Sequence, residues 1–202
     1  MNKISGRGRP RQFDEQEVLH KAGLIFLQEG FESASYEMIA EKLKLSKPSI
    51  YNAFGDKTAL FEKALSNYAD QAAHEINESF SNQASYADAA LSLFTSAAHF
   101  YSQGQSHSLG CLLVGTALPA TTQNVQVQST LKRFTSSLES SIQSLIEEQY
   151  MRGLKATGTT PKAAALHIVS LIFALAVRAR MGQSKRALTN TAREFKQLVA
   201  RE

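Results

Sequence analysis

The sequence of 202 residues has little cysteine and little proline: one cysteine, Cys111, and four prolines. A single thiol cannot form an internal disulfide, and a chain of this size that folds without one fits a reducing compartment, so we expect the cytoplasm. The N-terminus lacks the apolar core of a secretory signal. The longest apolar run, Ala163 to Val177, is interrupted by His167 and Ser170. We therefore interpret this run as a buried helix and expect no membrane span.

The sequence also lacks the residue groupings that metal binding and catalysis require. His99, His107 and Cys111 are near one another in the chain, but no compact set of metal ligands emerges around them. No nucleophile, base and orienting acid occur at a meaningful spacing. We therefore expect no metal, no cofactor, no catalytic residues and no enzymatic activity.

Strand signals are scarce as well, because apolar residues recur every three or four positions and do not alternate. A hydrophobic content of 43% is sufficient for a core. The sequence therefore predicts an all-α fold with about nine helices. Asp14, Ser35, Ser46 and Asp56 are the predicted N-caps of the first four helices, and the fourth continues to about Phe80. The later helices are predicted at residues 85–103 and 109–118, along the apolar stripe that begins at Val127, from Thr160-Pro161 onward, and along the stripe that begins at Leu188.

The short helix that follows Ser46 has the size and the donors needed to enter a DNA major groove. Ile50 and Phe54 are predicted to face inward. The side chains predicted to face outward are those of Lys47, Ser49, Tyr51 and Asn52. DNA binding is therefore the leading hypothesis, although a net charge of +4 supports it only weakly.

Residues 1–12 are predicted to be a basic, flexible arm. They contain Arg7, Arg9 and Arg11, together with Lys3, and no acidic residue. Such an arm suits a polyanion, and its arginines are candidates for contacts with phosphates or with the minor groove. An unstructured basic tail without such a role is the alternative.

Several motifs in the first third of the chain carry a family resemblance. They are Gly8-Arg9-Pro10-Arg11, Ala22 with Phe26, Gly30-Phe31, Ser35 with Ile39-Ala40, Ser46-Lys47-Pro48-Ser49-Ile50-Tyr51, Phe54, and Lys57 with Leu60-Phe61. These residues resemble the AcrR-like DNA-binding module of the TetR family of bacterial transcriptional regulators. The resemblance implies a helix-turn-helix domain at residues 13–58. It also implies that the long fourth helix joins this domain to a helical ligand-binding and dimerisation domain at residues 59–202.

The resemblance also implies which residues contact DNA, with Ser46 to Phe54 as the recognition helix. The implied residues are Arg7, Arg9, Arg11, Ser35, Ser46, Lys47, Pro48, Ser49, Tyr51, Asn52 and Lys57. The chemistry agrees, because the Tyr51 ring suits a thymine methyl group and Asn52 can pair with adenine. Lys44 occupies a turn position where the family often has glycine. A left-handed backbone would cost a lysine there about 1–2 kcal/mol, so we expect a slightly different turn.

The family encloses an inducer pocket in its second domain, and a mixture of aromatic and hydroxyl side chains suits a moderately apolar small molecule. The candidate lining residues are Phe94, Tyr101, Thr116, Phe134 and Phe173, whose default role is core packing. The last two helices are predicted to form a homodimer, because apolar residues run nearly around the penultimate helix and a monomer cannot cover them all. The expected partners are thus a double-stranded DNA operator, a second copy of the chain and a small-molecule inducer. The expected function is that of a repressor.

Two alternatives remain open at this point. Cys111 lies in a Gly-Cys-Leu segment similar to that of TetR-like regulators that respond to electrophiles or oxidants, and His107 or a helix N-terminus would lower its thiol pKa. The competing interpretation of Cys111 is an inert, buried side chain. The alternative from another class is a helical ligand-binding or enzymatic bundle with a non-functional DNA-binding head.

Overall fold

The computed structural model describes residues 13–80, 83–102, 110–117, 119, 124–153 and 158–199, and every regular element in these ranges is helical. The predicted all-α class is confirmed. The elements are α1 (Glu15–Glu29), α2 (Tyr36–Leu43), α3 (Lys47–Phe54), α4 (Lys57–Phe80), α5 (Tyr86–Tyr101), η1 (Leu113–Ala117), α7 (Val125–Met151), α8 (Pro161–Arg180) and α9 (Lys185–Val199).

The first four helices begin where the sequence predicts, because a side-chain oxygen accepts a hydrogen bond from a free backbone N–H at each start. The bonds run from Gln16 N to Asp14 Oδ1 (2.8 Å), Met38 N to Ser35 Oγ (3.1 Å), Ser49 N to Ser46 Oγ (3.3 Å) and Ala59 N to Asp56 Oδ1 (2.9 Å). Gly30 ends α1 with a positive φ of 83°. Local chemistry therefore fixes the bounds of these helices.

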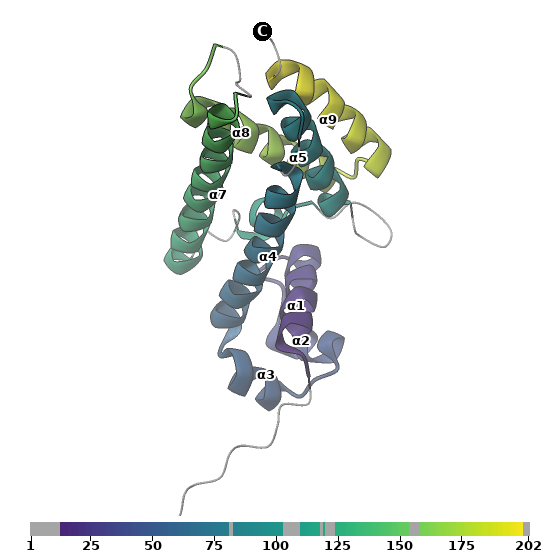
Figure 1. The fold of residues 1–202 in the computed structure, drawn as a ribbon. Helices are drawn as coiled ribbons and strands as arrows, with labels where there is room; N and C mark the ends of the chain where they lie inside the picture. Colours follow the sequence, from purple (N-terminus) through teal and green to yellow (C-terminus); the bar gives the residue numbers. More distant parts are fainter. Residues whose placement is uncertain are drawn as a thin grey trace, which may run out of the picture.

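The helices form two parts joined by α4 (Figure 1). The N-terminal module consists of α1, α2 and α3 and packs against the first half of α4. The ring centroids of Phe26 and Phe31 each lie 5.0 Å from that of Phe61 on α4. The second half of α4 enters a bundle with α5, α7, α8 and α9. With 24 residues, α4 is about 36 Å long and connects the two parts directly.

The turn between α2 and α3 differs from the expectation drawn from Lys44. Lys44 adopts the left-handed conformation, with φ 56° and ψ 37°, in place of an altered turn. Its backbone N–H donates to the carbonyls of Ala40 and Glu41, and Leu45 N donates to Ala40 O at 3.1 Å. This closure satisfies the last carbonyls of α2 and offsets part of the strain.

The predicted helix at residues 109–118 is also different. In the described range 110–117 the regular structure is one π-helical turn, η1, and residues 109 and 118 lie outside the described part. Gly110 precedes it with a φ of 80°. A glycine with a positive φ is typical of the boundary of a regular helix, so the regular structure begins after Gly110 and takes π-helical geometry at Leu113–Ala117.

Helix α8 is the apolar run singled out in the sequence. Among the described helices it alone has the length and mean hydropathy (1.7) that crossing a membrane would require. Its side chains Ile168, Ile172, Leu175 and Ala179 are nevertheless buried, and it packs against α5, α7 and α9. Such packing is that of the central helix of a bundle.

Candidate nucleic-acid interface

Helix α3 presents one face to solvent and anchors the other in the core. Ile50 and Phe54 are 0% and 1% exposed, whereas Tyr51 is 59% exposed although it is a large aromatic side chain. Lys47, Pro48, Ser49 and Asn52 are also exposed. The structure thus brings the predicted outward residues of α3 together on one surface.

Tyr36 supports this surface and was not among the predicted site residues. Its hydroxyl donates to Gly55 O at 2.6 Å, and its ring lies 6.5 Å from that of Tyr51, edge to face. Burial raises the pKa of Tyr36, so the phenol remains a hydrogen-bond donor. A tyrosine at the first position of α2 carries no sequence signal for this contact, since Tyr51 lies on α3 and Gly55 directly follows that helix.

The lysines near α3 already have partners within the chain. Lys47 Nζ pairs with the Glu37 carboxylate, and this hydrogen bond lowers the pKa of Glu37. Lys57 Nζ donates to Phe31 O (3.0 Å) and Glu32 O (3.2 Å) and lies 4.7 Å from the centroid of the Phe31 ring. A phosphate that binds either ammonium group must compete with these contacts.

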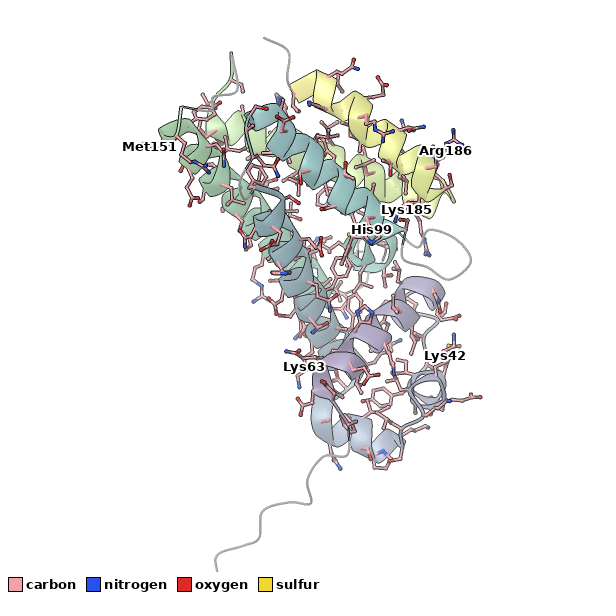
Figure 2. The ribbon with its side chains drawn as sticks, turned by 45° about the vertical axis from the view of Figure 1, so that its right-hand side comes forward. Lys42, Lys63, His99, Met151, Lys185 and Arg186 are labelled. Atoms are coloured by element: carbon pink, nitrogen blue, oxygen red, sulfur yellow. The ribbon has the colours of Figure 1, made fainter. Side chains whose placement is uncertain are left out.

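Two further lysines, one on α2 and one on α4, also have partners within the chain. Lys42 pairs with Glu29 at 2.6 Å, and Lys63 Nζ donates to Ala53 O at 3.3 Å; both lysines are marked in Figure 2. Lys44 is exposed, and its side chain forms no ion pair or hydrogen bond with the described residues. The unbound surface is therefore partly neutralised by the protein itself.

Four further predicted DNA contacts are Ser35 and the three arginines of the N-terminal arm. Arg7, Arg9 and Arg11 lie outside the described residues. Ser35 is exposed at the start of α2, where its hydroxyl caps the helix.

A small cavity lies in the bundle, between α4, α5, α7 and α8. Its volume is about 40 Å³, and Tyr101, Phe134 and Phe173 of the predicted set line it. Phe94 packs instead against Phe195 of α9, with 5.8 Å between ring centroids. Thr116 is buried at the junction with α1, where its Oγ1 donates to Phe26 O at 3.0 Å. The structure therefore separates these two residues from the cavity.

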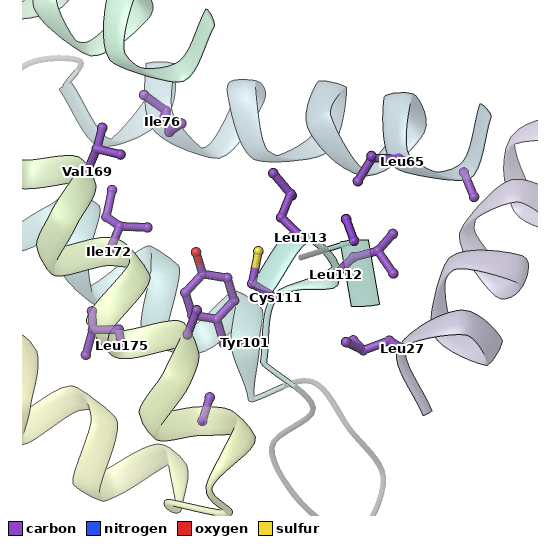
Figure 3. Close-up of a cluster of buried hydrophobic side chains, with 14 of the residues drawn as sticks. Leu27, Leu65, Ile76, Tyr101, Cys111, Leu112, Leu113, Val169, Ile172 and Leu175 are labelled. Atoms are coloured by element: carbon purple, nitrogen blue, oxygen red, sulfur yellow. The ribbon is translucent and has the colours of Figure 1, made fainter. Parts of the chain in front are cut away.

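Cys111 lines the same cavity, next to Tyr68 and Tyr101. Figure 3 shows the thiol beside the Tyr101 ring. It is 3% exposed, and burial raises the pKa of its thiol in spite of the hydrogen bonds with the two phenols. A raised pKa opposes formation of the reactive thiolate. His107 lies outside the described residues, and within the described part no His, Cys, Asp and Glu side chains group to hold a metal ion.

An exposed helix anchored at the end of a three-helix module, with a separate bundle that encloses a cavity, defines the class of helix-turn-helix regulators. Residues 18–64 match the family model described as bacterial regulatory proteins, tetR family. This match covers the N-terminal helix-turn-helix module, and the relatives and solved structures described next extend the likeness to such regulators over most of the chain.

The relatives agree over most of the chain. The HTH-type transcriptional repressor ComR of Escherichia coli is 26% identical over 92% of this chain and 89% of its own length. BdcR, another HTH-type transcriptional repressor of that species, is 29% identical over 53% of this chain and 54% of its own length.

Solved structures share the fold. A cysteine mutant of the TetR family regulator CifR, complexed with 26-bp operator DNA, has a TM-score of 0.82 and 24% identity, and the match covers 94% of this chain and 98% of CifR. The reduced form of E. coli NemR has a TM-score of 0.77 and 20% identity over 92% of this chain and 96% of NemR.

Proposed function

We propose that the protein is a homodimeric, sequence-specific DNA-binding transcriptional repressor, released from a palindromic operator by a small molecule. The observation that carries this proposal is the exposed face of α3, on which the Tyr51 side chain is in solvent while Ile50 and Phe54 of the same helix are buried. Residues 13–58 would read DNA, and residues 59–202 would bind the ligand and form the dimer. The names of ComR and BdcR, both repressors, support this function, and the proposal includes no enzymatic activity.

On DNA, α3 would lie in the major groove. Tyr51 would place its ring against a thymine methyl group or its hydroxyl on a phosphate, and Asn52 would pair with adenine. Lys47 and Lys57 would exchange their internal partners for phosphates, which adds counterion release to the binding free energy. CifR, which shares the fold, was solved with double-strand operator DNA.

Dimerisation would use a stripe of exposed apolar side chains on α8. Leu166 and Val177 are 53% and 45% exposed, and Met181, just beyond the helix, is 77% exposed. The apolar side chains of α9 are mostly used within the subunit, since Leu188 and Ala192 are buried. A two-fold dimer through this stripe would hold two α3 helices for successive major grooves, about 34 Å apart.

Release would begin in the cavity. It borders α4, and the same helix packs against the N-terminal module, so an occupant that prefers a different position of α4 would move α3. Only a difference in affinity between the two states can drive this shift. The thiol-switched alternative is less favoured because burial keeps Cys111 protonated.

The test replaces Tyr51 with alanine and measures binding to the DNA upstream of the protein's own gene at rising salt. We expect wild type to form a specific complex with a steep salt slope, and Tyr51→Ala to lose it while the dimer mass in sedimentation stays unchanged. Wild-type affinity in the variant would refute the assigned surface. Failure of wild type to bind any DNA at low salt would favour the bundle with a non-functional head.

A further inference from the structure

We propose that Arg180, in the last turn of α8, is a positioning residue for DNA recognition. Its guanidinium group holds the C-terminal end of α1 and so fixes the N-terminal module relative to the bundle. This inference rests on the proposed DNA-binding function. It assigns to Arg180 a role that no motif of the sequence indicates.

The contact joins residues far apart in the chain. Arg180 Nη1 donates to Leu27 O at 2.7 Å, across 153 positions of sequence. Leu27 O is among the last four carbonyls of α1, which have no donor inside the helix. The helix dipole makes this end partially negative, and α1 has no basic residue of its own in its last turn. A cation from α8 therefore supplies a charge-assisted hydrogen bond that α1 cannot provide for itself.

A second bond holds the neighbouring carbonyl. Thr116 of η1 is 1% exposed, and its Oγ1 donates to Phe26 O at 3.0 Å. Adjacent carbonyls of α1 are thus bound by two different elements of the bundle side, η1 and α8. Two bonds restrict rotation of the helix end where a single bond would act as a pivot.

Two glycines leave the space that Arg180 needs. A Cβ on Gly115 would lie 3.0 Å from Leu27 Cδ1 and 3.6 Å from Arg180 Nε. A Cβ on Gly110, which has a φ of 80°, would lie 2.9 Å from Ala176 O and 3.3 Å from Arg180 Cβ. In Figure 3, Leu112, two residues after Gly110, lies near Leu27 of α1. The absence of a Cβ at Gly110 and Gly115 thus leaves room for the Arg180 side chain to reach α1.

Arg180, which holds α1, also lies close to the proposed dimer surface on α8. The proposed dimer stripe includes Val177, one turn earlier on the same helix. The end of α8 therefore both faces the partner subunit and holds α1. Since α1 packs on α4 and carries the rest of the N-terminal module, the contact sets how far apart the two α3 helices lie. Without it, Thr116 is left as the second bond that holds this helix end, so each module rotates about α4 more easily and the pair fits successive grooves less often.

The experiment compares two duplexes with two variants of the full-length dimer. Arg180→Met removes the contact, and Arg178→Met removes the same charge from a second exposed arginine of the same helix, one that makes no such contact with α1. Binding is measured to the full palindrome and to a single half-site. For Arg180→Met we expect about ten-fold weaker binding to the palindrome, the size of a lost charge-assisted bond, and unchanged half-site binding. Arg178→Met should leave both unchanged, and Arg180→Lys should recover part of the loss.

Hydrogen exchange provides a measurement that needs no DNA. Amides in residues 22–31 should exchange at least about five-fold faster in Arg180→Met than in Arg178→Met, because the helix end opens more often. Equal losses on palindrome and half-site would show that Arg180 only stabilises the module, and would overturn the proposal. Unchanged palindrome binding or unchanged exchange would overturn it as well. If wild type binds no DNA while exchange responds as expected, the proposed function fails and the structural contact stands.

Discussion

Replacing Lys44 with glycine is expected to stabilise the protein. Lys44 has a φ of 56° and is the only non-glycine residue with a positive φ in the described ranges. The left-handed region costs an L side chain about 1–2 kcal/mol, whereas glycine costs about 0.5–1 kcal/mol in chain entropy. The difference is a gain of about 0.5–1 kcal/mol in the free energy of unfolding. The exposed Lys44 side chain forms no ion pair or hydrogen bond with the described residues, so its loss does not reduce this gain.

Thermal unfolding followed by far-UV circular dichroism, at fixed protein concentration, measures the effect. A gain of this size raises the Tm by about 1–4 °C for a chain of this length. Lys44→Ala removes the charge but keeps the strained backbone, so we expect no change. Glu41→Gly places glycine inside α2 and should cost about 1 kcal/mol. If Lys44→Gly is no more stable than Lys44→Ala, the left-handed strain assigned to this turn does not exist.

Three further predictions concern DNA binding, the thiol and the dimer. Glu37→Gln frees Lys47 from its ion pair, so non-specific DNA affinity in a filter-binding assay should rise. The rise should be several-fold larger than in Glu41→Gln, which changes a matched exposed acid on the same helix. Equal rises would contradict the idea that Glu37 competes with phosphate for Lys47. Burial raises the pKa of Cys111, so alkylation of the native protein should stay slow at neutral pH and accelerate only above the usual thiol pKa. An electrophile should therefore release no more DNA from wild type than from Cys111→Ser. Leu166→Glu combined with Val177→Glu places charges on the proposed dimer stripe and should give monomers in sedimentation velocity; a persistent dimer would move the interface elsewhere.

Local features of the sequence predicted most of the fold. Asp14, Ser35 and Ser46 are caps whose oxygens bond to N–H groups two or three residues away, so their effect can be read without knowledge of the tertiary structure. The outward face of α3 follows in the same way, because Ile50 and Phe54 are one helical turn apart. The left-handed turn at Lys44 was not predicted, because its strain is offset by hydrogen bonds that only the folded turn shows. The π-helical segment η1 was not predicted either, since apolar composition does not distinguish π-helical from α-helical geometry.

The sequence by itself determined that the chain is helical, where its first helices begin and which side of α3 is exposed, since these properties depend on neighbours within about one turn. Only the tertiary structure decided that Glu37 holds Lys47, that Tyr101 and Phe134 share a cavity while Phe94 does not, and that Arg180 reaches Leu27. Those contacts join separate helices, and the angles at which helices pack depend on the shapes of whole surfaces rather than on any local pattern of residues.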